Sequence, residues 1–260
     1  IAAAAKFDQI ILAVGIDQSI TGEGRDRHNI TLPGQQPELV SRILALNKPT
    51  ALVMVNGASL GIEMYVDEPN LHAIIEAWQP GVRGMTALAA LLVGKENRWG
   101  RLATTLYKST FVEEQALIQY SQTKYPGRSY KYYQKPVSFA FGAGIGYHSS
   151  KIACSLTPPY AINCNITHIS GPAGDEVVQV YHIPPVGLKV DHPLPIKRLV
   201  AFERVHLPAM ATPVCVFFNL TANDLRLVDK SGGSSLYAGT HGLQIWLGHG
   251  APINLTATVH

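Results

Sequence analysis

The segment Ile10–Arg27 reads IILAVGIDQSITGEGRDR, and it joins a continuous apolar run to a polar loop. A run that is apolar at nearly every position is typical of a parallel strand buried on both faces. The loop that follows holds one glutamate, Glu23, between two glycines. Because ligands bind at the carboxyl ends of parallel strands, this loop is a candidate functional site.

Strand and helix patterns alternate from this segment to about residue 94. The stretches TALVMVNG (50–57) and LHAIIEAW (71–78) have the composition of two further buried strands. Apolar residues with helical spacing between Leu39 and Leu46 predict a helix that ends before Pro49, and MTALAALLVG (85–94) predicts a second helix. This alternation predicts a parallel sheet with helices on both faces.

The pattern changes near residue 150 to short alternating strands between Pro and Gly turns. The strand candidates are EVVQVYHI (176–183), RLVAFERVHL (198–207), PVCVFFNLT (213–221) and LQIWLGH (243–249). Such a series is typical of a β-sandwich. We therefore predict an α/β domain over residues 1–150 and an all-β sandwich over residues 151–260.

Composition narrows the class of protein. Only 15% of the 260 residues are charged, the net charge is +3, and Lys and Arg are scattered, which argues against a nucleic-acid partner. No apolar run approaches the roughly 18 residues needed to span a membrane. The first residues, IAAAAKFD, have no initiator Met and no signal-peptide pattern, so we expect the last turns of a helix in a fragment or a processed chain.

Glycosylation and cysteine patterns suit a secreted protein. Four acceptor sequences of the form Asn-x-Thr begin at Asn29, Asn165, Asn219 and Asn254. The three cysteines, Cys154, Cys164 and Cys215, predict one disulfide and one free thiol, with the pairing left open. The ten histidines show no metal-ligand spacing, so we expect no metal and no cofactor.

The residues around Glu23 strengthen the hypothesis that its loop is a functional site. Glycines on both sides allow the backbone to approach a ligand closely. The next charged residues, Arg25, Asp26 and Arg27, are expected to pair among themselves and hold the loop rigid, or to contact substrate.

Several motifs in order carry a family resemblance. The segment GIDQSITGEGRDRHNITLPGQQPELV (15–40) resembles the start of the second domain of glycoside hydrolase family 3 enzymes, and its spacing is closest to the β-xylosidase branch. Further matching stretches are AIIEAWQPG (73–81), ALLVGKENRWGRLATT (90–105), YPGRSYKYY (125–133) and FAFGAGIGY (139–147). GDEVVQVYHIPP (174–185) and PIKRLVAFERVHL (195–207) resemble the fibronectin III-like domain that closes many of these enzymes.

The resemblance implies both an architecture and a reaction. It implies an α/β sandwich with a mostly parallel six-stranded sheet, followed by a fibronectin III-like β-sandwich. It further implies the C-terminal portion of a secreted retaining exo-glycosidase, an exo-1,4-β-xylosidase acting on β-linked xylo-oligosaccharides. Glu23 would be the general acid/base, and an aspartate on an N-terminal TIM-like barrel outside these residues would be the nucleophile.

Three other readings stay open. The first is a β-glucosidase of the same family, and the second is a non-catalytic glycan-binding or adhesion protein. The third is a serine hydrolase, because GASLG (57–61) fits the G-x-S-x-G pattern with Ser59 as nucleophile. That pattern requires a helix directly after the serine, and LGIEMYVDEPN (60–70) does not predict one.

Overall fold

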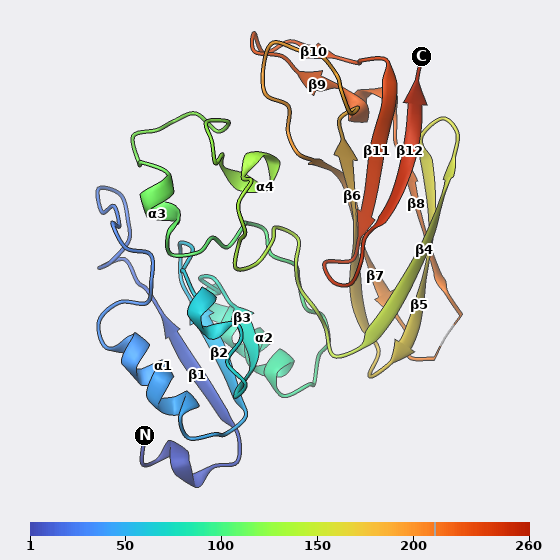
Figure 1. Cartoon of the computed structure of the whole chain (residues 1–260). Coiled ribbons are helices and arrows are strands. Elements are labelled where there is room, and N and C mark those ends of the chain that lie inside the picture. The colour runs from blue at the N-terminus through green and yellow to red at the C-terminus, as the bar shows by residue number, and fades with distance from the viewer. Residues whose placement is uncertain (211) are drawn as a thin grey trace. The chain divides into compact units, whose positions relative to one another are not determined.

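The computed structural model describes residues 1–210 and 212–260, which fold into two units (Figure 1). The first unit comprises Ile1–Ala89, Thr105–Tyr120 and Lys135–Ala140. The second comprises Ala90–Thr104, Ser121–Gln134 and Phe141–His260. The sequence predicted two independently folding domains that meet near residue 150. That boundary stays a prediction.

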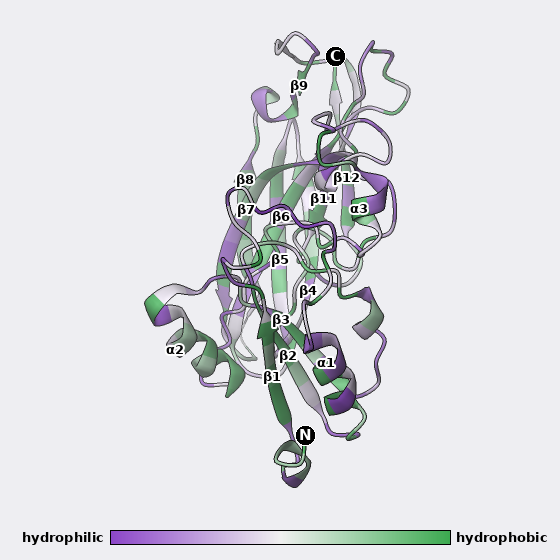
Figure 2. Cartoon of the chain, turned by 90° about the vertical axis from the view of Figure 1, so that its left-hand side faces the viewer, coloured by the Kyte–Doolittle hydropathy of each residue, from purple (hydrophilic) through white to green (hydrophobic). Residues whose placement is uncertain are grey.

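The first unit contains a three-stranded parallel sheet with strand order β1-β2-β3. Its strands are β1 (Ile10–Gly15), β2 (Thr50–Val55) and β3 (Leu71–Glu76). Leu52, Val53 and Met54 of the central strand are buried, as expected for a strand flanked on both sides. Figure 2 shows the hydrophobic colour along β1. The apolar runs thus form the parallel strands, but only β2 is buried as predicted, since Ile11 of β1 is 58% exposed and β3 contains no buried residue.

Both predicted helices are present. They are α1 (Gln36–Leu44) and α2 (Gly81–Leu92), and shorter helical turns are η1 (Ala4–Lys6), η2 (Glu63–Tyr65), α3 (Phe111–Glu114), α4 (Ser129–Tyr132) and η3 (Ala222–Leu225). Helix α1 begins with a proline in its first turn and buries Val40, Ile43 and Leu44 on one face. The alanine-rich start forms only the three-residue turn η1, because so short a segment does not sustain an α-helix by itself.

The prediction of a six-stranded parallel sheet is wrong for the part of the chain that the structure describes. Its parallel sheet has three strands. Residues 94–148 contain no apolar run longer than three residues, and a parallel strand buried on both faces needs a longer one. This segment instead forms α3, α4, loops and an isolated bridge between Leu106 and Phe139.

The second unit contains an antiparallel β-sandwich, as predicted from the alternating strands. One sheet has the order β12-β11-β6-β7 and the other β4-β5-β8, with a short hairpin of β9 and β10. The strands are β4 (Ser149–Thr157), β5 (Ala161–Ser170), β6 (Gly174–Ile183), β7 (Arg198–Leu207), β8 (Val214–Asn219), β9 (Leu227–Val228), β10 (Ser234–Ser235), β11 (Gly239–Trp246) and β12 (Ile253–Val259). Four strands facing three is the arrangement of fibronectin-like sandwiches.

Alternating side chains from both sheets form the sandwich core. Ile162 and Ile166 of β5 and Val178 and Val180 of β6 are fully buried in it. Every second residue of β5 and β11 points inward, which follows from the two-residue period of a strand. The sequence predicted β6, β7, β8 and β11, whereas β4, β5 and β12 were not among the predicted strands.

A disulfide links two neighbouring strands of the smaller sheet. Cys154 of β4 pairs with Cys164 of β5, and the exposed Cys215 of β8 keeps a free thiol. The thiol of Cys215 lies 2.9 Å from Oδ1 of Asn165 on the adjacent strand. The prediction of one disulfide and one free thiol is confirmed, and the structure resolves the pairing.

Candidate active site at the carboxyl ends of the parallel strands

The Glu23 loop, defined here as residues 16–34, leaves the carboxyl end of β1. A bridge between Gly22 and Arg25 turns the chain back on itself and places Glu23 at the tip. The Glu23 side chain is exposed, and it has no hydrogen-bond or ion-pair partner among the residues that the structure describes. The structure therefore presents a solvent-accessible carboxylate where sequence placed the candidate site.

Arg25 contacts the backbone at the start of the Glu23 loop. Its guanidinium donates hydrogen bonds of 2.9 Å to the carbonyl oxygens of Gln18 and Ser19. Nearby, Asp17 accepts hydrogen bonds from the backbone and hydroxyl of Ser19, which lower the pKa of its carboxyl. Arg25 thus rigidifies the loop through backbone contacts.

Arg27 ties the Glu23 loop to the loop after β2. Its Nη2 donates a 2.6 Å hydrogen bond to the carbonyl oxygen of Ser59. The side chain is half-buried, and burial lowers the pKa of the guanidinium. The exposed Asp26 joins no ion pair with Arg25 or Arg27, so the expected pairing within the loop is replaced by carbonyl contacts.

Gln36 contacts the other end of the loop, and sequence reasoning missed it. Its side-chain nitrogen donates to the carbonyl oxygen of Gly15, and its side-chain oxygen accepts from the amide of Gly15, both at 2.8 Å. A side chain at position 15 would collide with the backbone of Val55, since a Cβ there would lie 1.8 Å from that carbonyl oxygen. The only available sequence signal was a glutamine at the expected start of a helix.

Glu76 is a second carboxyl at this end of the sheet that sequence reasoning missed. It ends β3, and its Oε1 accepts a 3.2 Å hydrogen bond from the backbone of Trp78. Its Oε2 is buried without a partner among the described residues. Burial raises the pKa of Glu76 to about 7, although the hydrogen bond from the backbone of Trp78 opposes that shift. The sequence signal that could have identified Glu76 was a single charged residue within the apolar run LHAIIEAW.

The loops after the three strands are joined by backbone contacts. The amide of Gly61 donates to the carbonyl oxygen of Ile30 at 2.8 Å, and the amide of Asn56 donates to the carbonyl oxygen of Trp78 at 3.2 Å.

A cavity of about 580 Å³ lies beside the Glu23 loop and is lined by residues that include Ile20, Gln36 and Leu39. Glu23 does not line this cavity.

Ser59 lacks the surroundings of a serine nucleophile. Its loop continues into the three-residue turn η2 at Glu63–Tyr65, and a nucleophile elbow needs an α-helix directly after the serine. The contact that the structure assigns to this residue uses its carbonyl oxygen, which accepts from Arg27. The serine hydrolase reading therefore loses its structural basis.

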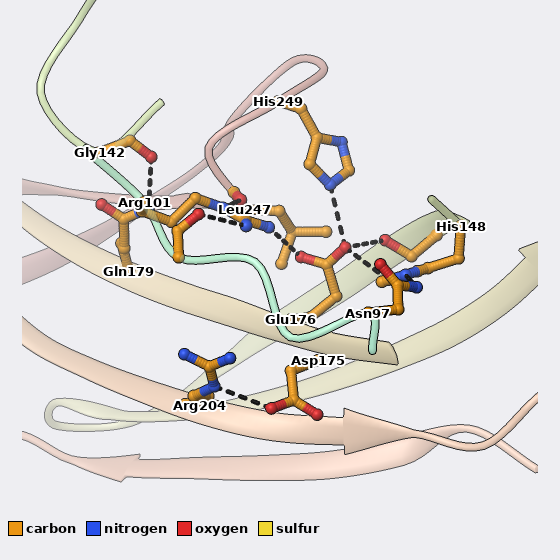
Figure 3. A network of polar contacts seen from close by, with 12 residues as sticks. Asn97, Arg101, Gly142, His148, Asp175, Glu176, Gln179, Arg204, Leu247 and His249 are labelled. Carbon is orange, nitrogen blue, oxygen red and sulfur yellow. Dashed lines mark hydrogen bonds and ion pairs between the residues drawn. The ribbon is translucent and has the colours of Figure 1, made fainter. Parts of the chain in front are cut away.

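The second unit contains a separate polar network centred on Glu176 of β6 (Figure 3). One carboxylate oxygen accepts from Arg101 at 2.6 Å. The other contacts His148 Nε2 at 3.0 Å, Ser150 Oγ at 3.0 Å and His249 Nε2 at 3.1 Å. Because Glu176 is fully buried and these groups surround its carboxylate, the network fixes the segments around Arg101 and His148 against the sandwich.

Asp175 anchors a neighbouring set of cations. It contacts Arg98, Arg204 and His206 at 2.9–3.2 Å. Despite burial, these hydrogen bonds lower the pKa of Asp175 to about 2. Both carboxylates therefore act as structural anions within the second unit.

The remaining predicted positions concern glycans, metals and membranes. Asn29, Asn165, Asn219 and Asn254 are all exposed. Among the described residues, no group of three or more His, Cys, Asp or Glu is arranged to hold a metal ion. No helix within that part of the chain is long and apolar enough to cross a membrane.

The model of the glycosyl hydrolase family 3 C-terminal domain matches residues 1–147, and that of the fibronectin type III-like domain matches residues 176–250. β-D-xylosidase 1 of Arabidopsis thaliana is 30% identical over 94% of this chain, and a probable exo-1,4-β-xylosidase of Aspergillus clavatus is 27% identical over 94%. The chain spans 37% and 34% of the lengths of these two relatives.

Solved structures show the same fold. A family 3 exo-β-xylosidase bound to a xylobiose aziridine probe superposes with a TM-score of 0.88 at 25% identity, covering 99% of this chain and 37% of that one. A β-glucosidase of Kluyveromyces marxianus in complex with glucose gives a TM-score of 0.83 at 26% identity, covering 100% and 32%. Because the family model spans more than half of its length, the chain belongs to glycosyl hydrolase family 3.

Proposed function

We propose that the chain is the C-terminal portion of a retaining exo-glycosidase in which Glu23 is the general acid/base. The observation that carries the proposal is the exposed carboxylate of Glu23 on a loop that Gln36 and Arg27 hold in place. The nucleophile would be an aspartate on an N-terminal barrel domain. The relatives support such a partner domain, because this chain covers only about a third of their length.

The reaction requires two carboxyl groups about 5 Å apart on opposite sides of the scissile bond. The barrel aspartate attacks the anomeric carbon while protonated Glu23 donates its proton to the departing oxygen. The ionised Glu23 then accepts a proton from the water that hydrolyses the glycosyl-enzyme. A negatively charged nucleophile close by favours the protonated form of the acid that the first step needs.

We propose β-linked xylo-oligosaccharides as substrates, ahead of β-glucosides. Relatives named as β-xylosidases in plants and fungi support this choice, whereas several structural neighbours are β-glucosidases. One hydroxymethyl group changes binding by only about 1–3 kcal/mol, so such specificity is readily altered. Comparing kcat/KM for aryl β-xyloside and aryl β-glucoside tests the choice, and a clear preference for the glucoside would reverse it.

The acid/base assignment is tested in the complete enzyme with the N-terminal domain in place. Replacing Glu23 with Gln should lower activity on alkyl glycosides by about 10²- to 10⁴-fold, because a poor leaving group needs protonation. Aryl glycosides with acidic leaving groups should still form the glycosyl-enzyme and then accumulate it. Azide needs no general base, so it should restore turnover and form a glycosyl azide of retained configuration.

Glu38→Gln is the matched control, because Glu38 is an exposed carboxylate on α1 outside the Glu23 loop. This variant should behave as wild type. Wild-type activity of Glu23→Gln on alkyl glycosides, or the absence of any azide effect, would show that Glu23 is not the acid/base.

We also propose that the protein is secreted and carries N-linked glycans. The support is that the four acceptor asparagines are all exposed.

A further inference from the structure

We propose that Gln36 is a positioning residue for the Glu23 loop, because its side-chain amide clamps the backbone of Gly15 where the loop leaves the sheet. The proposal rests on the assignment of Glu23 as acid/base. It adds a residue of α1 to the set that determines where the proton donor lies.

The clamp is a two-point contact that few side chains can make. Gln36 accepts from the Gly15 amide and donates to the Gly15 carbonyl oxygen, both at 2.8 Å. Asparagine is one methylene shorter, glutamate has no N–H to donate, and lysine cannot accept. The pair of bonds therefore requires both the length and the amide group of glutamine.

Local backbone geometry brings Gln36 back to Gly15, which lies 21 residues earlier. Gly34 has a φ of 57°, a left-handed conformation that glycine adopts without strain, and it turns the chain just before α1. Pro37 then occupies the first turn of the helix. The position of Gln36 follows from this turn and from the packing of α1.

Further along, the loop is fixed by contacts to the loop after β2. Arg27 binds the carbonyl oxygen of Ser59, and the carbonyl oxygen of Ile30 accepts from Gly61. Glu23 thus lies on the stretch between the Gln36 clamp and the Arg27 contact. Releasing the clamp would leave the near end of that stretch held by the hydrogen bond from the Ile16 amide to the Val55 carbonyl oxygen and by the Arg25 contacts.

Small displacements matter for proton transfer. A general acid must lie within hydrogen-bond distance of the leaving oxygen, and a misplacement of about 1 Å costs on the order of 10²-fold in rate. Glu23 has no partner of its own among the described residues, so its position is determined through the loop backbone.

The first experiment measures amide hydrogen exchange in the 260-residue chain itself. Gln36→Ala should speed exchange of residues 15–26 by about 30-fold, since two hydrogen bonds of about 1 kcal/mol each are lost. Exchange in α1 and β2 should stay unchanged. Gln36→Glu, which keeps the length and the acceptor, is a second variant and should also speed exchange in the loop.

Gln35→Ala is the matched control, because the exposed Gln35 precedes α1 and makes no side-chain capping bond. It should leave exchange unchanged. If both Gln36 variants leave the loop protected, or speed exchange in α1 and β2 as much as in the loop, Gln36 only supports the helix and the proposal is wrong.

The second experiment measures leaving-group dependence in the complete enzyme. Gln36→Ala should lower kcat/KM for alkyl glycosides by about 10- to 100-fold and leave that for aryl glycosides with acidic leaving groups within about twofold. A uniform loss on both substrate classes would indicate general damage and overturn the proposal. Glu23→Gln is measured in parallel. If Glu23→Gln shows no leaving-group dependence, the proposed function is wrong. If Glu23→Gln shows this dependence and Gln36→Ala does not, only the proposed role of Gln36 is wrong.

Discussion

At the scale of single residues, Glu76 is an ionisable group in an apolar place. Its side chain is half-buried at the end of β3, so desolvation favours the neutral acid and raises its pKa to about 7. One carboxyl oxygen has no partner among the described residues. Ionisation of Glu76 therefore destabilises the folded first unit at neutral pH.

The sign of the effect follows from the two pKa values. The unfolded chain releases this proton near pH 4.5 and the folded chain near pH 7, so the stabilisation by neutral Glu76 is complete below pH 4.5 and is lost as the pH rises to about 7. Glu76→Gln should be more stable than wild type at pH 8, by on the order of 2 kcal/mol after allowance for solvent screening. At pH 4 the two proteins should be equal.

Urea denaturation at pH 4 and pH 8 measures this difference. Glu68→Gln is the control, because Glu68 is exposed, and it should change stability little at either pH. A stability gain for Glu76→Gln that is the same at both pH values would contradict the titration argument.

At the scale of elements, the network around Glu176 holds buried charges together in the second unit. The side chains of Arg101 and Glu176 are 5% and 0% exposed, and Nη2 of Arg101 lies 2.6 Å from Oε2 of Glu176. Removing one partner of such a pair costs about 3–5 kcal/mol, because the other charge stays buried without it. The contact therefore matters far more than an exposed ion pair.

Arg101→Met should destabilise the second unit by about 3–5 kcal/mol in urea denaturation. The matched control is Arg42→Met, which breaks the exposed pair between Arg42 and Glu38 on α1 and should cost less than about 0.5 kcal/mol. Equal effects of the two substitutions would show that the buried network contributes no special stability.

At the scale of the whole molecule, the four exposed acceptor asparagines predict a glycoprotein. Protein made through a glycosylating secretory pathway should carry glycans at several of Asn29, Asn165, Asn219 and Asn254. Peptide mass spectrometry after enzymatic deglycosylation should show conversion of Asn to Asp at those sites. Material made in bacteria serves as the control, and unmodified asparagine at all four sites in both preparations would contradict the secretion proposal.

Much of the fold was predictable because it depends on local patterns. The run TALVMV identifies a buried strand and the alternation in LQIWLGH a sandwich strand, without knowledge of their neighbours. The six-stranded sheet was inferred from the family, and it failed where residues 94–148 lack apolar runs. Local pattern therefore outweighed family likeness at this point.

The candidate site was predictable only in part, for the same reason. Glu23 could be placed because its loop follows a recognisable strand. Gln36 and Glu76 could not, because their roles depend on tertiary contacts: an amide that returns to Gly15 across the turn at Gly34, and a carboxyl enclosed by packing. Neither contact has a fixed spacing that a sequence pattern would reveal.

The clamp at Gly15 also bears on self-association. Among the described strands, β1 is an outer strand of its sheet, and outer strands expose backbone groups that can pair with another molecule and seed aggregation. The amide of Gln36 occupies the Gly15 donor and acceptor in the way a neighbouring strand would. Glutamine at this position therefore gives the first unit a protected end of the strand, and its loss should leave the protein more prone to form intermolecular sheets.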